Sequence, residues 1–492
     1  MKGKAFKLFG KVAFFASAIT CLLIFTGCPP EQELFPPAQY SSELIEDYVA
    51  TKAALQDTMP SDICAYIDFS DGVNLAYDDA GTKEVLRTIL NSLSGSSCAY
   101  FRLADSKMDT IQGTPEDIFN KAINPKEYLK QKAPIRTALE QIIADGKPAV
   151  LITDYEEYDG NKIMKNAFAK RFFVDWLKKD RNITFLIVDY KEKGKDKKLF
   201  FTIFDGNPNR LIDKITSALQ GKPENYKKFV MSNSYYEVKT NYPAANKGGN
   251  YHGEDGIDNV TCVQEDISME DRYIAMPKFK AEYYPLTVPY SDVIANGYAM
   301  QYESKPYPPY SYTYFIQNFY FDFTRFAYDD VELDVKVSNA QADYTNYYNY
   351  VYAENQRPNH AEGSEDNYFD VYGNNKFPYA EAAMSEVKDM FKLEDDPSEK
   401  YPSPVTFDGF REYGLDFDWD KFDGTQINGA ELGDLLRVDI VIEDVDDKDA
   451  DELEPLFKWG DYDNLSESVR LALQEVRPIG KVVYTFYIHA QN

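Results

Sequence analysis

Cysteine and histidine are scarce in this sequence, and their arrangement excludes several classes of protein. The 492 residues include five cysteines and three histidines, and none of them forms a CxxC pair or a Cys/His cluster. A disulfide scaffold and a zinc site are therefore not expected. The motifs GxSxG, HExxH and the phosphate-binding P-loop are also missing, so we expect a protein without catalytic activity. The enzymatic alternative is a hydrolase that works through carboxylates alone.

Positive charge is also in short supply. Lysine and arginine number 53 against 81 aspartate and glutamate residues, which gives a formal net charge of −28. Such a surface repels nucleic acid and anionic lipid headgroups, so neither is expected as a partner. It is compatible with divalent cations, basic proteins or neutral glycans. The alternative is that the acidity only keeps an exported protein soluble.

No apolar run reaches the roughly 18 residues of a membrane-spanning helix. The run from Val12 to Phe25 follows four lysines and has the layout of a secretory signal. It ends in Phe25-Thr26-Gly27-Cys28, which resembles the lipobox of bacterial lipoproteins, with Phe25 where leucine is usual. The resemblance implies a signal peptide over residues 1–27, a lipid on Cys28, and attachment to the outer membrane on its periplasmic or cell-surface face. The alternative is a core helix or an uncleaved anchor.

The next segments predict a tether and then an α/β domain. Residues 28–57 combine a proline-stiffened tether with a short helix over 42–56. From 58 to 221, continuous apolar segments alternate with amphipathic helical ones. This alternation indicates a doubly wound, mostly parallel sheet that is buried on both faces. The expected helices include 82–93, 134–144, 163–178 and 208–219.

Two strand ends carry the polar residues of this domain. Asp68 and Ser70 follow the apolar segment 63–67, and Asp154 follows the segment 149–153. A strand that ends in DxS, followed later by a strand that ends in Thr-Asp, resembles the von Willebrand factor A domain, and the resemblance covers residues 58–221. In that family a DxSxS loop, a threonine and an aspartate form a metal-ion-dependent adhesion site.

The resemblance implies a metal site at Asp68, Ser70 and Asp154, with Mg²⁺ or Mn²⁺ as the ion and a protein ligand completing its coordination. Two positions depart from the family pattern: Gly72 stands where the second serine belongs, and residues 132–134 hold no threonine. Because Mg²⁺ prefers six oxygen ligands in near-octahedral array, these losses weaken the site. The two alternatives are a weak retained site and a degenerate one, in which both aspartates only bond helix N-termini or loop amides.

Two cysteines lie in Cys-Ala-Tyr segments that this fold places on neighbouring strands. They are Cys64 and Cys98. In an oxidising compartment they form either a cross-strand disulfide or two buried free thiols, because parallel strands often do not suit a bridge.

Beyond residue 221 the composition changes. Tyrosine, proline and asparagine become more frequent, and apolar residues alternate with polar ones in 331–337, 436–443 and 482–489. Period-two alternation is typical of half-buried antiparallel strands. We therefore expect residues 222–492 to form a β-rich, sandwich-like α+β region of one or two subdomains, interrupted by helices near 379–391 and 465–476.

Together these patterns predict a lipid-anchored adhesion protein that binds a macromolecular partner, in the first place a protein, at the crevice of Asp68, Ser70 and Asp154. The first alternative is a glycan-binding surface lipoprotein that uses C-terminal tyrosines, such as the cluster in residues 344–352. The second is a structural part of a surface assembly, in which the A-like fold only packs.

Overall fold

The computed structural model describes the chain between residues 37 and 491, with gaps. The described residues are 37–52, 59–94, 96–160, 162–206, 210–222, 225–234, 236–239, 274–287, 314–324, 326–356, 381–388, 391–395, 409–417, 422–423, 426–427, 430–431 and 433–491. The expected signal peptide over residues 1–27 and the expected lipidation site at Cys28 lie outside them. Within the described part, no helix is long and apolar enough to cross a membrane.

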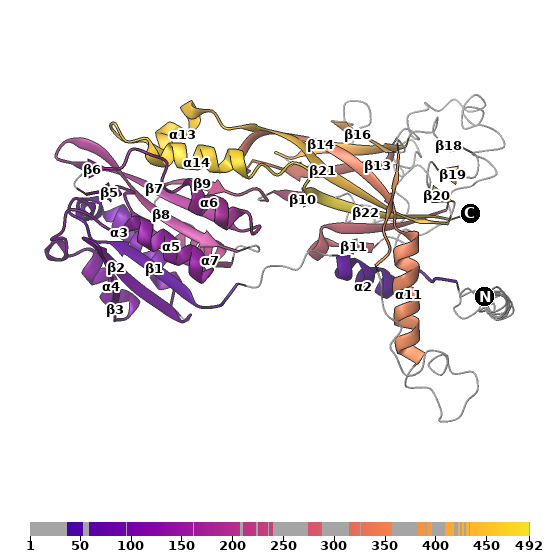
Figure 1. Ribbon diagram of the computed structural model, residues 1–492, viewed down its shortest axis with the longest axis horizontal. Coiled ribbons are helices and arrows are strands. Elements are labelled where there is room, and N and C mark those ends of the chain that lie inside the picture. The colour runs from indigo at the N-terminus through magenta and orange to yellow at the C-terminus, as the bar shows by residue number, and fades with distance from the viewer. Residues whose placement is uncertain are drawn as a thin grey trace, which may run out of the picture.

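The sheets define two units. An α/β unit is built on a seven-stranded sheet, and a β unit is built on a six-stranded and a four-stranded sheet (Figure 1). The α/β class expected for the first part of the chain and the β-rich class expected for the second are both observed.

The seven-stranded sheet has the order β3-β2-β1-β4-β8-β7-β9. At its centre, β1 (Ile63–Asp68) pairs in parallel with β2 (Cys98–Ala104) and with β4 (Ala149–Thr153). At one edge, β3 (Lys107–Ile111) pairs antiparallel with β2. Every residue of β1 and β4 is buried, as expected for strands that are covered on both faces.

One hairpin departs from the winding expected from the sequence. β7 (Asn182–Glu192) and β8 (Lys195–Asp205) are joined by a tight turn, and it is the antiparallel β8 that pairs with β4. β7 lies one place further out and pairs with β9 (Lys227–Met231) at the sheet edge. Because β7 runs in the same direction as β4, the turn of the hairpin lies at the carboxyl ends of β1 and β4.

Helices cover both faces of this sheet. One face packs against the 3-10 helix η2 (Val73–Asp78), α3 (Ala80–Ser92), α4 (Pro115–Ala122) and α7 (Arg210–Leu219). The other packs against α5 (Ile135–Asp145) and α6 (Lys170–Leu177). The connections contain η3 (Pro125–Glu127) and the small hairpin of β5 (Tyr158–Asp159) and β6 (Lys162–Ile163).

Local sequence determines where two of these helices, α3 and α4, begin. At α4, the Thr114 hydroxyl accepts from the Asp117 amide at 3.3 Å, and the Asp117 carboxylate accepts from the Thr114 amide at 2.9 Å. This reciprocal capping box satisfies two amides that the helix itself leaves unpaired. At α3, Asp79 is the N-cap and accepts from the Thr82 amide at 2.7 Å.

The β unit contains two sheets that share a core. The six-stranded sheet has the order β11 (Ile274–Met276), β12 (Ala281–Thr287), β22 (Val482–Gln491), β21 (Leu435–Asp447), β14 (Tyr328–Asn339) and β15 (Ser385–Val387). The four-stranded sheet has the order β10 (Glu237–Lys239), β13 (Tyr314–Asp322), β17 (Arg411–Phe417) and β16 (Phe391–Asp395). Phe319 of β13 and Phe486 of β22 meet across the core, with ring centroids 5.3 Å apart.

Smaller elements complete the β unit. The 3-10 helix η5 (Pro277–Phe279) joins β11 to β12, and a three-stranded sheet holds β18 (Phe422–Asp423), β19 (Gln426–Ile427) and β20 (Ala430–Glu431).

The helix next to the predicted tether belongs to the β unit. α2 (Ser42–Lys52) and α11 (Gln341–Gln356) pack together on the six-stranded sheet, and Ile45 and Tyr48 of α2 share a buried cluster with Tyr487 of β22. The Tyr48 hydroxyl donates to Asp343 Oδ2 at 2.8 Å. From α2 onward, the described chain therefore passes from the β unit to the α/β unit and then returns to the β unit.

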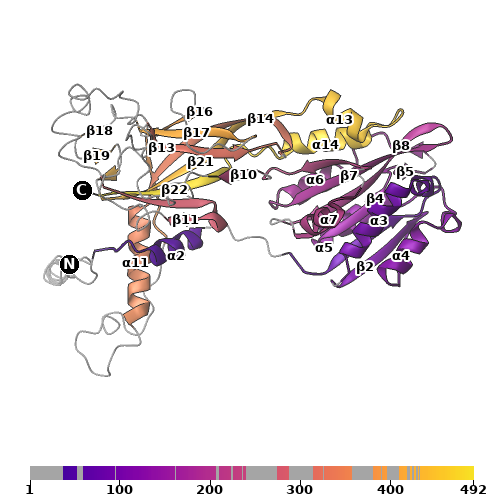
Figure 2. The same cartoon turned by 180° about the vertical axis from the view of Figure 1, so that it is seen from behind.

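A second connection runs the other way. α13 (Ala450–Phe457) and α14 (Asn464–Glu475) lie between β21 and β22 in sequence but reach over the α/β unit (Figures 1 and 2). The Phe457 ring lies 5.1 Å from the ring of Phe185 in β7 and 5.2 Å from that of Phe229 in β9. Part of the helical cover of the seven-stranded sheet therefore comes from the far end of the chain.

Two expectations about the C-terminal half are settled by tertiary contacts. The helix expected near 465–476 is α14. The helix expected near 379–391 was wrong: residues 385–387 form β15, because Val387 is buried beside Val337 of β14. Residues 344–352, the tyrosine cluster considered for sugar binding, lie in α11.

The strand register decides the state of the two cysteines. Cys64 lies opposite Ala99, and Cys98 lies opposite Ile63, on neighbouring parallel strands. Paired residues project to the same face and successive residues to opposite faces, so the two thiols point to opposite faces of the sheet. Of the two alternatives, the structure therefore has free thiols.

Candidate functional site

The structure brings the three predicted site residues to one edge of the seven-stranded sheet. Asp68 is the last residue of β1, Ser70 follows two residues later, and Asp154 comes directly after β4. All three are buried. Because β1 and β4 are adjacent and parallel, their carboxyl ends form one crevice, the place where open α/β sheets bind ligands.

The Asp68 carboxylate is held by its neighbours. Its Oδ1 accepts from the Ser70 amide at 2.7 Å, and its Oδ2 accepts from the Thr153 hydroxyl at 2.7 Å. The Thr153 hydroxyl in turn accepts from the Tyr155 amide at 3.1 Å. Thr153 therefore joins the ends of β1 and β4 through the Asp68 side chain.

A lysine lies beside the second carboxylate. Asp154 Oδ1 accepts from the Glu156 amide at 3.0 Å. The Lys197 ammonium forms an ion pair with Glu156, and a Glu192 oxygen lies 3.5 Å from it. The side chains of Lys197 and Glu156 are only 11% and 10% exposed. Four carboxylates and one ammonium are thus gathered around the crevice.

Sequence reasoning missed Lys197, Glu156 and Glu192. The only sequence signal for Lys197 is its phase in β8, two residues before the buried Leu199 and four before Phe201, which places its side chain on the buried face.

Burial dominates the electrostatics of the crevice. It raises the pKa of Asp154 well above its usual range, and the charges of Glu156 and Asp68 add to the effect. Burial also raises the pKa of Asp68, although hydrogen bonds from Ser70 and Thr153 oppose the shift. For Lys197, burial lowers the pKa, but Asp154 and Glu156 outweigh it and the net pKa is raised. The lysine therefore stays charged and partly compensates carboxylates that water does not reach.

The residues present do not fit a closed Mg²⁺ site. Both Asp68 oxygens and one Asp154 oxygen already accept hydrogen bonds, and Gly72 offers no hydroxyl. The loop before α5 supplies backbone rather than a threonine: its Lys130 carbonyl accepts from the Asp71 amide at 2.5 Å. In the part of the chain that the structure describes, no three histidine, cysteine or acidic side chains are grouped so as to hold a metal.

The rim of the crevice carries an exposed leucine. Leu129 is 78% exposed, the most exposed of the three large hydrophobic residues that stand out on the described surface. The backbone on either side of it is fixed: Tyr128 is buried, with its hydroxyl donating to the Ala122 carbonyl at 2.6 Å, and Lys130 forms a β-bridge with Ser70. Leu129 is therefore presented to solvent on a rigid loop beside the predicted site residues.

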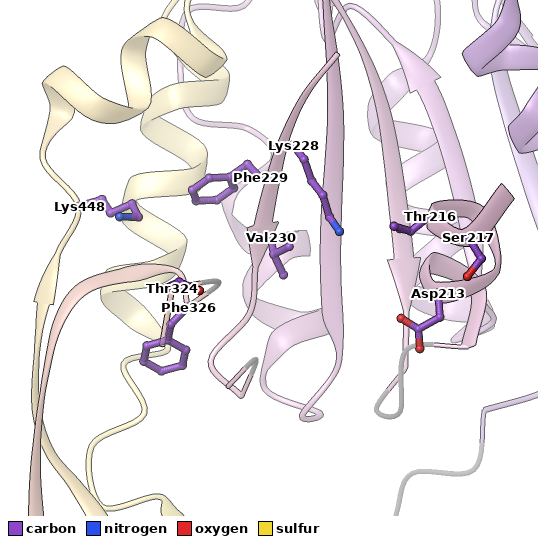
Figure 3. Close-up of a pocket in the computed structure, with 9 residues that line it drawn as sticks. All are labelled: Asp213, Thr216, Ser217, Lys228, Phe229, Val230, Thr324, Phe326 and Lys448. Carbon is purple, nitrogen blue, oxygen red and sulfur yellow. The ribbon is translucent and has the colours of Figure 1, made fainter. Parts of the chain in front are cut away.

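A separate hollow of about 550 Å³ lies at the β9 edge of the sheet. Figure 3 shows Phe229 pointing to the side of Phe326 and Lys448, while Lys228 and Val230 point the opposite way, toward α7. Side chains from both faces of β9 thus line the hollow. Its volume is within the range of small-molecule sites, but Lys448 is already paired with Asp329 and Glu452.

The tyrosines considered for sugar binding are largely covered. Tyr344, Tyr347 and Tyr348 of α11 are all buried. Tyr344 and Tyr347 pack against Tyr48 of α2, with ring centroids 5.2 and 5.5 Å from it. Tyr344 and Tyr347 thus hold α11 to α2, Tyr348 stacks on Tyr352 of the same helix, and the three buried rings offer little free face to a glycan.

Comparison with known proteins adds no relative. No protein-family model, no curated protein and no solved structure matches the chain. The assignment of function therefore rests on the geometry of the crevice and its rim, and on the residues that resemble the A-domain and lipobox patterns.

Proposed function

We propose that this chain is a lipoprotein of the bacterial outer membrane that displays a von Willebrand A-like unit to a protein partner. The partner docks at the carboxyl edge of β1 and β4, over the crevice of Asp68, Ser70 and Asp154. Leu129 is the observation that carries the proposal, because a rigidly held, exposed apolar side chain next to a polar crevice is the arrangement of an interface anchor with a polar rim. Catalysis has no part in it.

The arrangement of the two units supports display. α2, which follows the tether, lies on the β unit, and the seven-stranded sheet lies at the opposite end of the molecule (Figures 1 and 2). With a lipid on Cys28, the β unit is near the membrane and the crevice is directed away from it. The periplasmic and the cell-surface face of the outer membrane both allow this arrangement.

Leu129→Asp is expected to abolish docking and leave the fold intact. Burying an aspartate in an interface without a partner is costly, so recovery of the partner should fall at least about tenfold. Immobilised protein is incubated with envelope extract, and retained proteins are quantified by mass spectrometry. Ile479→Asp is the matched control, because Ile479 is also exposed, at 50%, but belongs to another surface.

The partner is defined as a protein retained by the wild type and by Ile479→Asp but lost with Leu129→Asp. Both variants should have the wild-type melting temperature. If they do and also retain the same proteins in the same amounts, the proposal that a partner docks at this rim is wrong.

Cys28→Ala is expected to release the protein from the membrane. Stable anchoring depends on the acyl chains, each buried CH₂ contributing about 0.8 kcal/mol. Labelled palmitate should enter the wild type and not the variant, and the variant should move from the membrane to the soluble fraction. Persistence of the unlabelled variant in the membrane pellet would favour the uncleaved anchor.

The glycan-binding and structural alternatives have less support. In the tyrosine cluster of residues 344–352, Tyr344, Tyr347 and Tyr348 are buried, which leaves the half-buried Tyr350 and Tyr352 to offer a face to a glycan. The structural alternative, in which the A-like fold only packs within an assembly, gives no reason for an exposed leucine at the crevice.

A further inference from the structure

The β7–β8 hairpin reaches into the crevice. Its turn lies at the carboxyl edge of the sheet, and Glu192 and Lys197 flank that turn on either side, facing the loop after β1. The β7–β8 hairpin thus brings these two charges to the site.

Gly72 shows how closely the hairpin approaches. A Cβ atom at this position would lie 3.0 Å from the Glu192 carboxylate, and the φ angle of Gly72 is +98°, which side chains rarely adopt. A serine in this conformation would be strained and would also displace Glu192. The space that the family pattern gives to a ligand hydroxyl is therefore taken by an acidic side chain of the hairpin.

Lys197 lies where the carboxylates converge. Its ammonium contacts Glu156 and is 3.5 Å from Glu192, and the Glu156 amide is bonded to Asp154. Asp68 is kept in place separately, by Ser70 and Thr153. A buried group of acids is stable only with a compensating positive charge. Lys193 also pairs with Glu192, at 3.6 Å, but its side chain is exposed, so within the described chain Lys197 is the largely buried cation that contacts this group.

We infer that Lys197 is the built-in cation of the crevice, and that its tethered ammonium takes the place of a divalent ion. The A-like unit then keeps its shape without a metal, and its docking does not respond to chelators. The inference concerns the same crevice as the proposed docking site but rests on side-chain contacts alone, and its test uses no partner.

The first test is calorimetric titration of Mg²⁺ and of Mn²⁺ into the full-length protein in detergent. The wild type and Asp154→Ala should give the same weak, non-stoichiometric heats, which the acidic surface produces. A stoichiometric site in the wild type that Asp154→Ala loses would overturn the inference.

The second test asks whether the charge itself matters. Lys197→Ala removes a propylammonium group, so its melting temperature should fall by at least about 5 °C. Propylammonium chloride should restore part of the loss, and tetramethylammonium chloride, which carries the charge but has no N–H to donate to the carboxylates, should not. Lys195→Ala, on the exposed side of the same turn, should respond to neither salt. Equal rescue by both salts, or no loss relative to Lys195→Ala, would contradict the inference.

If Lys197→Ala does not fold, two milder variants test whether the positive charge stabilises the crevice. Lys197→Arg keeps the positive charge and should melt near the wild-type temperature, whereas Lys197→Gln should melt lower. Equal melting temperatures for the two would contradict a role for the charge.

Discussion

Phe457→Ala is expected to lower the free energy of unfolding by about 3–5 kcal/mol. Phe457 is fully buried, and its ring meets those of Phe185, Phe200 and Phe229 at centroid distances of 5.1, 6.1 and 5.2 Å. Its removal leaves a cavity between α13 and the seven-stranded sheet. Urea unfolding followed by circular dichroism measures the loss.

The same experiment tests whether the two units unfold together. Because α13 belongs to the insertion between β21 and β22, loss of its contact with β7 and β9 should shift a single cooperative transition. Leu456→Ala is the control, since this neighbouring side chain is only partly buried and should cost much less. Two separate transitions, with that of the α/β unit unchanged in Phe457→Ala, would show that α13 is not part of its core.

Lys197→Met is expected to cost about 3–5 kcal/mol at neutral pH, because removal of one partner from a buried ion pair leaves the other charge uncompensated. Lys195→Met should be nearly neutral, since Lys195 is exposed. Adding Asp154→Asn to Lys197→Met should recover part of the loss, because it removes one of the uncompensated carboxylates. No recovery in the double variant would place the cost in packing rather than in charge.

The loss in Lys197→Met should also depend on pH in a defined direction. Burial holds the pKa of Asp154 above its usual range, so the folded state binds its proton more tightly than the unfolded chain does. The contribution of Asp154 to stability is then most favourable at low pH and declines as pH rises above the unfolded value of about 3.9. The deficit of Lys197→Met should therefore be smaller at pH 5 than at pH 8, measured by urea unfolding at both. A deficit that grows on acidification would contradict the assignment.

Much of the α/β unit follows from short-range pattern. The all-apolar segments around Tyr66 and Leu151 predict buried strands, and Thr114 followed by Pro115 and Asp117 predicts the start of α4. Asp68, Ser70 and Asp154 could be placed at one edge, because consecutive parallel strands end at the same side of a sheet. Each of these inferences depends on residues close together in sequence.

The positions of the β7–β8 hairpin and of α13 in the tertiary structure could not be predicted from such local patterns. β7 and β8 are both apolar strands of equal length, so pattern alone cannot say which of them lies next to β4. The acid-rich sequence around the start of α13 does not predict this helix, and nothing in it shows which sheet the helix covers. Lys197 could not be recognised as a site residue, because its meaning depends on Glu156 and Glu192, which only the hairpin placement brings to it.

By itself, then, the sequence determined the buried strands of the α/β unit, the start of α4, the positions of Asp68, Ser70 and Asp154 at strand ends, and the resemblance to a lipoprotein signal. Only the tertiary structure decided that α2 rests on the β unit, that α13 and α14 complete the helical cover of the other unit, and that the crevice holds an ammonium. The physical reason is the distance along the chain over which each kind of interaction acts. Hydrogen-bonded periodicity and capping act over a few residues, whereas burial of an apolar face or of a charge is satisfied by whichever distant segment of the chain fits it.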